Sequence, residues 1–219
     1  MNQIVRDVHR AAVLAGAGCL LLFALVVSMS ADAAGGCPVC GKNLVKNPGA
    51  ELGRGVMAVG AYGAVPGWSN ESGQFGAAAY AFPNGWFSAT SQGPKDRGKN
   101  YFFGGTTRTA VDAKASVGKQ TIALPVKAVG RKATLSGWLG NYGSIRSQVR
   151  AEFLDASGAV LTTVRIGPVV TTGSTNMVLR SRTGTVPANA KQVAVSIILG
   201  PNALSYNLAG VDNVSLVLT

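Results

Sequence analysis

Cys37 and Cys40, separated by Pro38 and Val39, form the most clearly chemical motif of this 219-residue chain. Two thiols at this spacing could ligate zinc, perform dithiol redox chemistry or close a disulfide. A closed zinc site needs four ligands, and no second cysteine pair follows in the sequence. A redox dithiol stands between a strand and a helix, whereas this pair leads into a predicted strand. We therefore expect a local disulfide formed after export, with an intermolecular disulfide and metal or redox chemistry as the alternatives.

The one histidine, His9, lies in an N-terminal segment with the features of an export signal. Two arginines precede an uncharged stretch over residues 11–31, and Ala31 and Ala33 supply the small residues of a cleavage site. We predict that residues 1–34 are a hydrophobic signal helix that is cleaved. The alternative is a retained signal anchor, because the 21 uncharged residues are long enough to span a bilayer. Both place the rest of the chain outside the cytoplasm, so we expect a secreted, extracellular or cell-wall location, with no membrane contact unless the leader is retained.

Without the leader the chain contains no histidine, and this removes a whole set of catalytic sites. A Ser-His-Asp triad, a Cys-His pair, His-ligated zinc and a His general base are all excluded. Glycoside hydrolysis needs two carboxylates with separate roles, and only seven of the nine acidic residues follow the leader. No Gly-x-Ser-x-Gly elbow is present, and no glycine-rich phosphate loop follows a strand. We therefore expect a protein that is not an enzyme.

Strand-like segments dominate the rest of the chain and must position any site. Alternating or short apolar runs separated by Gly, Pro and Asn turn signals occur at residues 120–126, 133–138, 149–153, 160–166, 177–185, 193–197 and 211–218. Residues 57–105 are richer in glycine and aromatics and predict short strands joined by long loops. We predict one all-β domain over residues 43–219, an antiparallel β-sandwich, preceded by a short cysteine-containing segment over 35–42.

Five motifs in a fixed order carry a resemblance to a known family. The chain opens the predicted domain with NLVKNPGAE at 43–51 and closes it with VDNVSL at 211–216. Between them lie PGW at 66–68, GKNYF at 98–102 and LSGWLG at 135–140. Together these motifs resemble the galactose-binding-like jelly rolls, a fold that many carbohydrate-binding modules share. The resemblance covers almost the whole chain after the leader and implies a jelly-roll sandwich, but the same fold also carries lipid-binding, protein-binding and structural domains.

The resemblance also implies a structural calcium ion where the first and last strands meet. The matching positions are Glu51 and Asp212, with a carbonyl near Lys99 as a further oxygen. A hard cation takes oxygen ligands, and it would stabilise the fold without doing chemistry. The alternative is that both carboxylates cap loops or pair with Lys46 or Arg54.

Aromatic and polar side chains are the candidates for ligand binding, because modules of this kind stack sugar rings on aromatic residues. The candidates are Trp138, Tyr142, Gln148, Arg150, Tyr206 and Trp86. The first four are expected to combine two ring platforms with amide and guanidinium hydrogen bonds. For Trp138 the alternative is a place in the core, which is also the expectation for Trp68.

The positive charge predicts a class of partner. The chain has 20 Lys and Arg against 9 Asp and Glu, and its net charge of +11 is the same without the leader. Outside the cell this favours anionic partners such as acidic polysaccharide, teichoic acid or lipid headgroups, with solubility as the alternative explanation. Export and the lack of a basic-aromatic motif argue against nucleic acid. Asn70 in an Asn-x-Ser motif is a glycosylation acceptor if the source is a eukaryote.

These observations favour a secreted, non-catalytic module that binds extracellular or cell-wall carbohydrate. The alternative is a structural or adhesive surface protein that contacts other proteins, with or without a disulfide link to them through Cys37 and Cys40.

Overall fold

The computed structural model describes residues 36–57, 63–82, 87–105, 114–143, 145–170, 175–201 and 207–219. Contacts divide the chain into two units, Met1–Ala34 and Gly35–Thr219. The predicted signal segment is the first unit and lies outside the described residues. Within the described ranges, no helix has the length and apolar character needed to cross a membrane.

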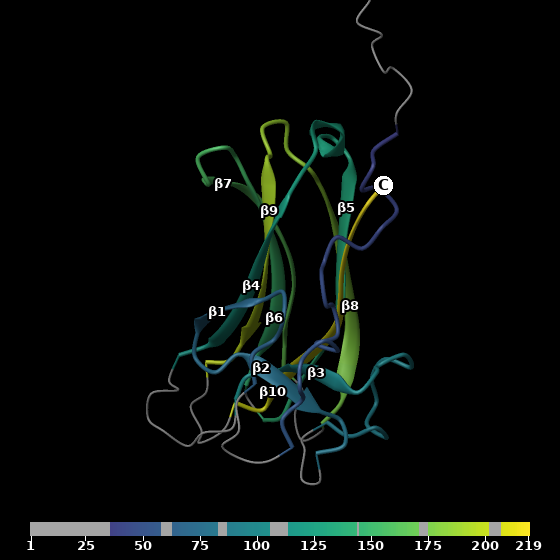
Figure 1. Cartoon of the computed structure of the whole chain (residues 1–219), viewed down its shortest axis with the longest axis vertical. Coiled ribbons are helices and arrows are strands. Elements are labelled where there is room, and N and C mark those ends of the chain that lie inside the picture. Colours follow the sequence, from purple (N-terminus) through teal and green to yellow (C-terminus); the bar gives the residue numbers. More distant parts are fainter. Residues whose placement is uncertain are drawn as a thin grey trace, which may run out of the picture. The chain divides into compact units, whose positions relative to one another are not determined.

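Two five-stranded sheets form the second unit (Figure 1). The β9 sheet has the strand order β1 (Ser69–Ser72), β4 (Ser116–Ala123), β9 (Gln192–Leu199), β6 (Ser147–Leu154) and β7 (Val160–Val169). The β10 sheet has the order β2 (Gly76–Ala79), β3 (Asn100–Phe103), β10 (Ala209–Leu218), β5 (Lys132–Asn141) and β8 (Met177–Thr185). A 3-10 turn, η2 (Val126–Ala128), precedes β5. All pairings between these strands are antiparallel, which confirms the predicted all-β sandwich.

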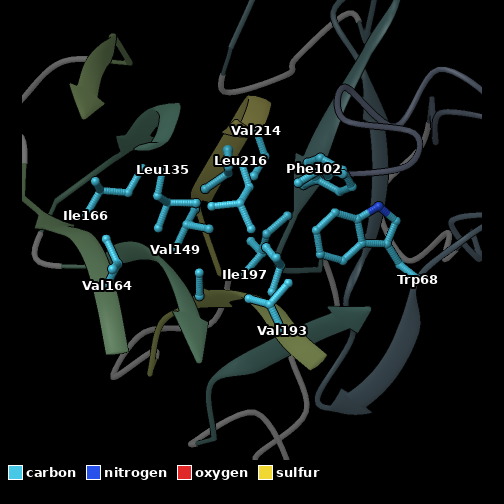
Figure 2. Close-up of a cluster of buried hydrophobic side chains, with 14 of the residues drawn as sticks. Trp68, Phe102, Leu135, Val149, Val164, Ile166, Val193, Ile197, Val214 and Leu216 are labelled. Carbon is cyan, nitrogen blue, oxygen red and sulfur yellow. The ribbon is translucent and has the colours of Figure 1, made fainter. Parts of the chain in front are cut away.

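The main core lies between the two sheets. Successive side chains of a strand point to opposite faces, so every second residue enters this core. On β6, for example, Val149 and Phe153 are fully buried. Figure 2 shows side chains from both sheets pointing toward one another, among them Val193 of β9 and Leu216 of β10. The predicted strand segments therefore supply the core as their alternation indicates.

A second apolar cluster covers the outer face of the β10 sheet. Its buried members are Ala78, Tyr80, Phe87, Tyr101, Phe103 and Met177. Most of them come from the aromatic-rich region, whose strands β1, β2 and β3 have only four residues each, as predicted. The aromatic residues of this region are thus used largely for packing.

The segment before the first strand is fastened to the last one. Cys37 and Cys40 are joined by a disulfide, which confirms the local bridge and leaves neither sulfur free to link two chains. Asn43 then pairs with β10: its Nδ2 donates to the carbonyl of Val214 at 3.1 Å, and its Oδ1 accepts from the amide of Leu216 at 3.0 Å. The asparagine that opens the first motif therefore ties the two ends of the sandwich together.

Gly118 in β4 provides a test of how closely this core is packed. A Cβ atom at this position would overlap the ring of Phe75. We expect Gly118→Ala to lower the free energy of unfolding by about 1–3 kcal/mol, because the ring has to leave its place between Trp68 and Phe102. Urea unfolding measures the change. Gly36→Ala, where a Cβ meets no atom within 4 Å, is the control, and equal effects of the two variants would contradict the expectation.

Candidate functional site

The outer face of β6 carries a row of polar side chains. Gln148, Arg150 and Glu152 alternate with the core residues of this strand and lie on the outside of the β9 sheet. Arg150 forms an ion pair with Glu152, with Nε and Oε2 3.3 Å apart. In register, Arg150 lies between Ser196 of β9 and Arg165 of β7. Three neighbouring strands, β9, β6 and β7, therefore hold this row on a regular sheet rather than on a loop.

The β6–β7 hollow lies beside this row and has a volume of about 420 Å³. Its lining residues are Gln148, Arg150, Glu152, Thr163, Arg165 and Arg182. These side chains offer amide, hydroxyl and guanidinium donors, one carboxylate and no aromatic ring. The hollow can therefore bind a polar or anionic ligand by hydrogen bonds, and it does not present a surface on which a sugar ring would stack.

The structure describes four of the six predicted ligand-binding residues and brings two of these four together. Gln148 and Arg150 line the hollow, whereas Trp138 lies opposite Asp212 on the outer face of the β10 sheet and packs against the second cluster. Tyr142, 46% exposed, follows β5 and does not line the hollow. This corrects the expectation of one shared platform: β5 and β6 are consecutive in the chain but belong to different sheets.

The remaining sequence candidates have separate places. Trp86 and Tyr206 lie outside the described residues. Trp68 is buried in the main core, as predicted. Asn70 lies on the exposed strand β1, where its Nδ2 donates to the carbonyl of Gly73 at 3.1 Å, and its role as a glycosylation acceptor stays a prediction.

Asp212 is a fully buried carboxylate held by a bulge in β10. Val211 enters the main core, so the next residue, Asp212, points to the outer face; the strand register shifts after it, where Asn213 takes a positive φ of 49°. Its Oδ2 accepts a hydrogen bond from the Tyr80 hydroxyl at 2.7 Å, and its Oδ1 accepts from the Asn213 amide at 2.7 Å. Burial raises the pKa of Asp212 to about 8, and the negative charges of Glu51 and Asp96 add to this rise. Without a bound cation, the Asp212 carboxyl therefore stays protonated at pH values at which an ordinary aspartate has lost its proton.

Glu51 lies at the surface beside this group. Its Oε1 accepts hydrogen bonds from the backbone amides of Lys99 at 3.1 Å and Asn100 at 2.9 Å, so it does cap a loop. The described residues contain one ion pair, that of Arg150 with Glu152. Accordingly, neither Glu51 nor Asp212 forms the alternative pair with a nearby cation.

Oxygen atoms of two side chains lie close to Gly49, where the sequence predicts a calcium site. No three Asp, Glu, His or Cys side chains form a metal-binding group in the part of the chain that the structure describes. Asp212 Oδ1 and Asn213 Oδ1 nevertheless lie 3.0 and 3.2 Å from the point that a Cβ on Gly49 would occupy, with Glu51 Cγ at 3.7 Å. Asp212 and Asn213 thus present oxygens here, one of them from a buried carboxylate without a cationic partner, which fits a hard cation, whereas Glu51 presents a carbon atom.

Solved structures with a similar fold include an enzyme domain of a bacteriophage tailspike and carbohydrate-binding modules. The enzymatically active domain of tailspike protein 4 from bacteriophage CBA120 is 15% identical, and the match covers 81% of this chain with a TM-score of 0.54. TmCBM61, solved with β-1,4-galactotriose, is 16% identical over 81% of this chain and 99% of its own, with a TM-score of 0.46. A family 16 carbohydrate-binding module is 17% identical over 80% and 99%, with a TM-score of 0.47.

Carbohydrate-binding modules are thus among the solved structures that this chain resembles, as its motifs predict. At these identities the likeness concerns the fold alone, and the chain spans about a fifth (21%) of the tailspike chain. No protein-family model and no curated protein sequence matches it.

Proposed function

We propose that this protein is an exported, non-catalytic module that binds extracellular or cell-wall carbohydrate on the outer face of the β9 sheet. The β6–β7 hollow carries the proposal. Gln148, Arg150 and Thr163 place amide, guanidinium and hydroxyl groups, which can bond sugar hydroxyls, on two paired strands. Because regular strands hold these groups, little ordering is needed when a ligand binds.

A binding role accounts for the hollow better than a hydrolytic one. Glycoside hydrolysis needs two carboxyl groups about 5–10 Å apart, one of them protonated. Glu152 is the one acidic residue that lines the hollow, and it is paired with Arg150. With the Cys37–Cys40 bridge closed, a structural or adhesive protein would have to make its contacts without a disulfide through these two sulfurs.

A comparison of two faces of the sandwich tests the proposal. We expect Gln148→Ala to weaken binding of a soluble glycan about 5- to 10-fold, the value of one or two hydrogen bonds. Trp138→Ala, on the β10 sheet, should leave the affinity within about twofold. Affinity electrophoresis against a panel of neutral and acidic polysaccharides, followed by calorimetry on the best ligand, measures both. Failure to bind any member of the panel, or a loss confined to Trp138→Ala, would refute the proposal.

We also propose that Asp212, Asn213 and Glu51 hold a structural calcium ion beside Gly49. The ion would neutralise a carboxylate that is otherwise buried without a positive partner, and its effect would be on stability. Asp212 and Asn213 lie on β10, and none of the three residues lines the hollow, so the ion takes no part in ligand binding.

A further inference from the structure

Four arginines from both sheets gather along one edge of the sandwich. β7 and β8 are the edge strands of their sheets, and they contact each other. Arg165 comes from β7, Arg180 and Arg182 come from β8, and Arg150 comes from β6 next to β7. We call this set the arginine groove.

The groove consists of two adjoining hollows. The first is the β6–β7 hollow, and the second, of about 300 Å³, is lined by Arg165, Arg180, Arg182 and Ser181 together with residues 166–168. Arg165 and Arg182 line both hollows, so the two form one continuous feature across the edge. A ligand longer than one sugar unit could thus contact all four guanidinium groups.

Strand pairing places like charges where they cost stability. Arg150 and Arg165 are directly opposite each other on β6 and β7, and like charges in such cross-strand pairs are destabilising. Arg180 and Arg182 lie opposite Gly137 and Leu135 of β5, and both are exposed. Charged residues on an edge strand can prevent aggregation, but this reason does not apply to Arg150, which is on an inner strand.

The charge of the groove is poorly balanced by the protein itself. Glu152 is the one acidic residue that lines either hollow, so four guanidinium groups face one carboxylate. Arg150 Nε is buried and has no hydrogen-bond acceptor although it lies 3.3 Å from Glu152. Arg180 donates to its neighbour's carbonyl, and within the described residues no acceptor is paired with Arg165 or Arg182. An anion bound here would supply the missing acceptors.

We propose that the arginine groove binds the anionic groups of an acidic polysaccharide, a proposal that rests on the carbohydrate-binding function. The guanidinium fork matches carboxylate and sulfate oxygens with two parallel hydrogen bonds. Because the two hollows share two arginines, they could bind a polymer that carries an anionic group on each successive sugar unit. Nucleic acid fits less well, because single-strand binding relies on aromatic stacking and neither hollow contains an aromatic ring.

The test measures binding of the full-length protein to polygalacturonate, dextran sulfate, neutral dextran and single-stranded DNA. The double variant Arg165→Gln/Arg182→Gln should lose about 10- to 100-fold in affinity for the acidic polysaccharide that binds best. Arg131→Gln/Lys191→Gln removes the same charge from two exposed positions that do not line the groove and should change the affinity less than about threefold. Arg165→Lys, which keeps the charge but loses the fork, should fall between the wild type and Arg165→Gln. A thermal scan of each variant verifies its folding.

The outcomes separate this proposal from the broader one. Stronger binding to polygalacturonate than to dextran sulfate identifies carboxylate as the preferred group, and the reverse identifies sulfate. Equal losses in the two double variants would overturn the groove in favour of diffuse attraction, and tighter binding to DNA than to either acidic polysaccharide would overturn the ligand class. If a neutral glycan binds and no acidic one does, the groove proposal fails while carbohydrate binding stands. If no glycan binds, both fail.

Discussion

Replacing Trp68 with alanine is expected to lower the free energy of unfolding by about 3–5 kcal/mol, a large part of the stability of a typical domain. The Trp68 ring contacts Phe102 edge-on at a centroid distance of 4.9 Å and Phe75 at 6.0 Å. Its Nε1 also donates to the carbonyl of Asn47 at 3.3 Å, inside the motif that opens the domain. The variant would lose buried area, ring contacts and one of the two hydrogen bonds to that carbonyl, which would keep the bond from the Ala50 amide.

Two further variants separate these contributions. Trp68→Phe retains a ring but not the Nε1 donor, so we expect a smaller loss of about 1–2 kcal/mol. Tyr142→Ala removes an aromatic ring that is 46% exposed and should change stability by less than about 0.5 kcal/mol. Urea unfolding followed by far-UV circular dichroism measures all three. A loss below 1 kcal/mol for Trp68→Ala would mean that this ring does not hold the aromatic cluster together.

In calcium-free buffer the protein should become less stable as the pH rises from about 4 to about 8. The pKa of Asp212 is about 8 in the folded chain against an ordinary value of 3.8. Between these values the folded chain holds a proton that the unfolded chain has released, so raising the pH favours unfolding. The contribution is complete below pH 3.8 and is lost as the pH passes through about 8, with a slope of about 1.4 kcal/mol per pH unit. Urea unfolding at several pH values in the presence of a chelator measures this slope.

The variant Asp212→Asn and the addition of calcium test whether Asp212 causes this pH dependence of stability. The asparagine still accepts a hydrogen bond from Tyr80 but does not titrate, so the slope should flatten and the variant should exceed the wild type in stability at pH 8. Calcium should raise the melting temperature of the wild type at pH 8, less so at pH 5, and leave the variant unchanged, because the ion competes with the proton for the carboxylate. No calcium effect at pH 8 would refute the ion site. A wild-type slope as flat as that of the variant would show that Asp212 is ionised in the folded state.

Alternation along the chain predicted the strands well because each inward side chain must reach the core. Residues 177–185 match β8 completely, and residues 193–197 and 149–153 lie within β9 and β6. The assignment of strands to sheets was not predictable in this way. Alternation shows that the side chains of Trp138 and Arg150 both point away from the core. It does not show that the two residues belong to different sheets. For that reason the prediction that Trp138, Tyr142, Gln148 and Arg150 form one binding surface was wrong.

The position of Arg165 depends on a bulge in the hairpin of β6 and β7. Leu154 pairs with Val160 next to the turn, but Phe153 pairs with Thr162, so Leu161 is the extra residue. An unshifted hairpin would place Arg165 opposite the core residue Val149. Since Val164 and Ile166 must share the core with Val149, the apolar pattern itself requires a shift of one residue. That signal was available in the sequence and would have placed Arg150 beside Arg165.

The pairing of Asn43 with Val217 has a mechanical consequence. The amide of Gly41 donates to the carbonyl of Leu218, so residues 41 and 218 leave the sandwich side by side from the same end of an antiparallel pair. Tension applied between these two points would load the connecting hydrogen bonds one after another, rather than all together as in strands pulled in opposite directions. The segment that begins at Gly41 would therefore separate from β10 under a small force, while the two sheets still enclose their core.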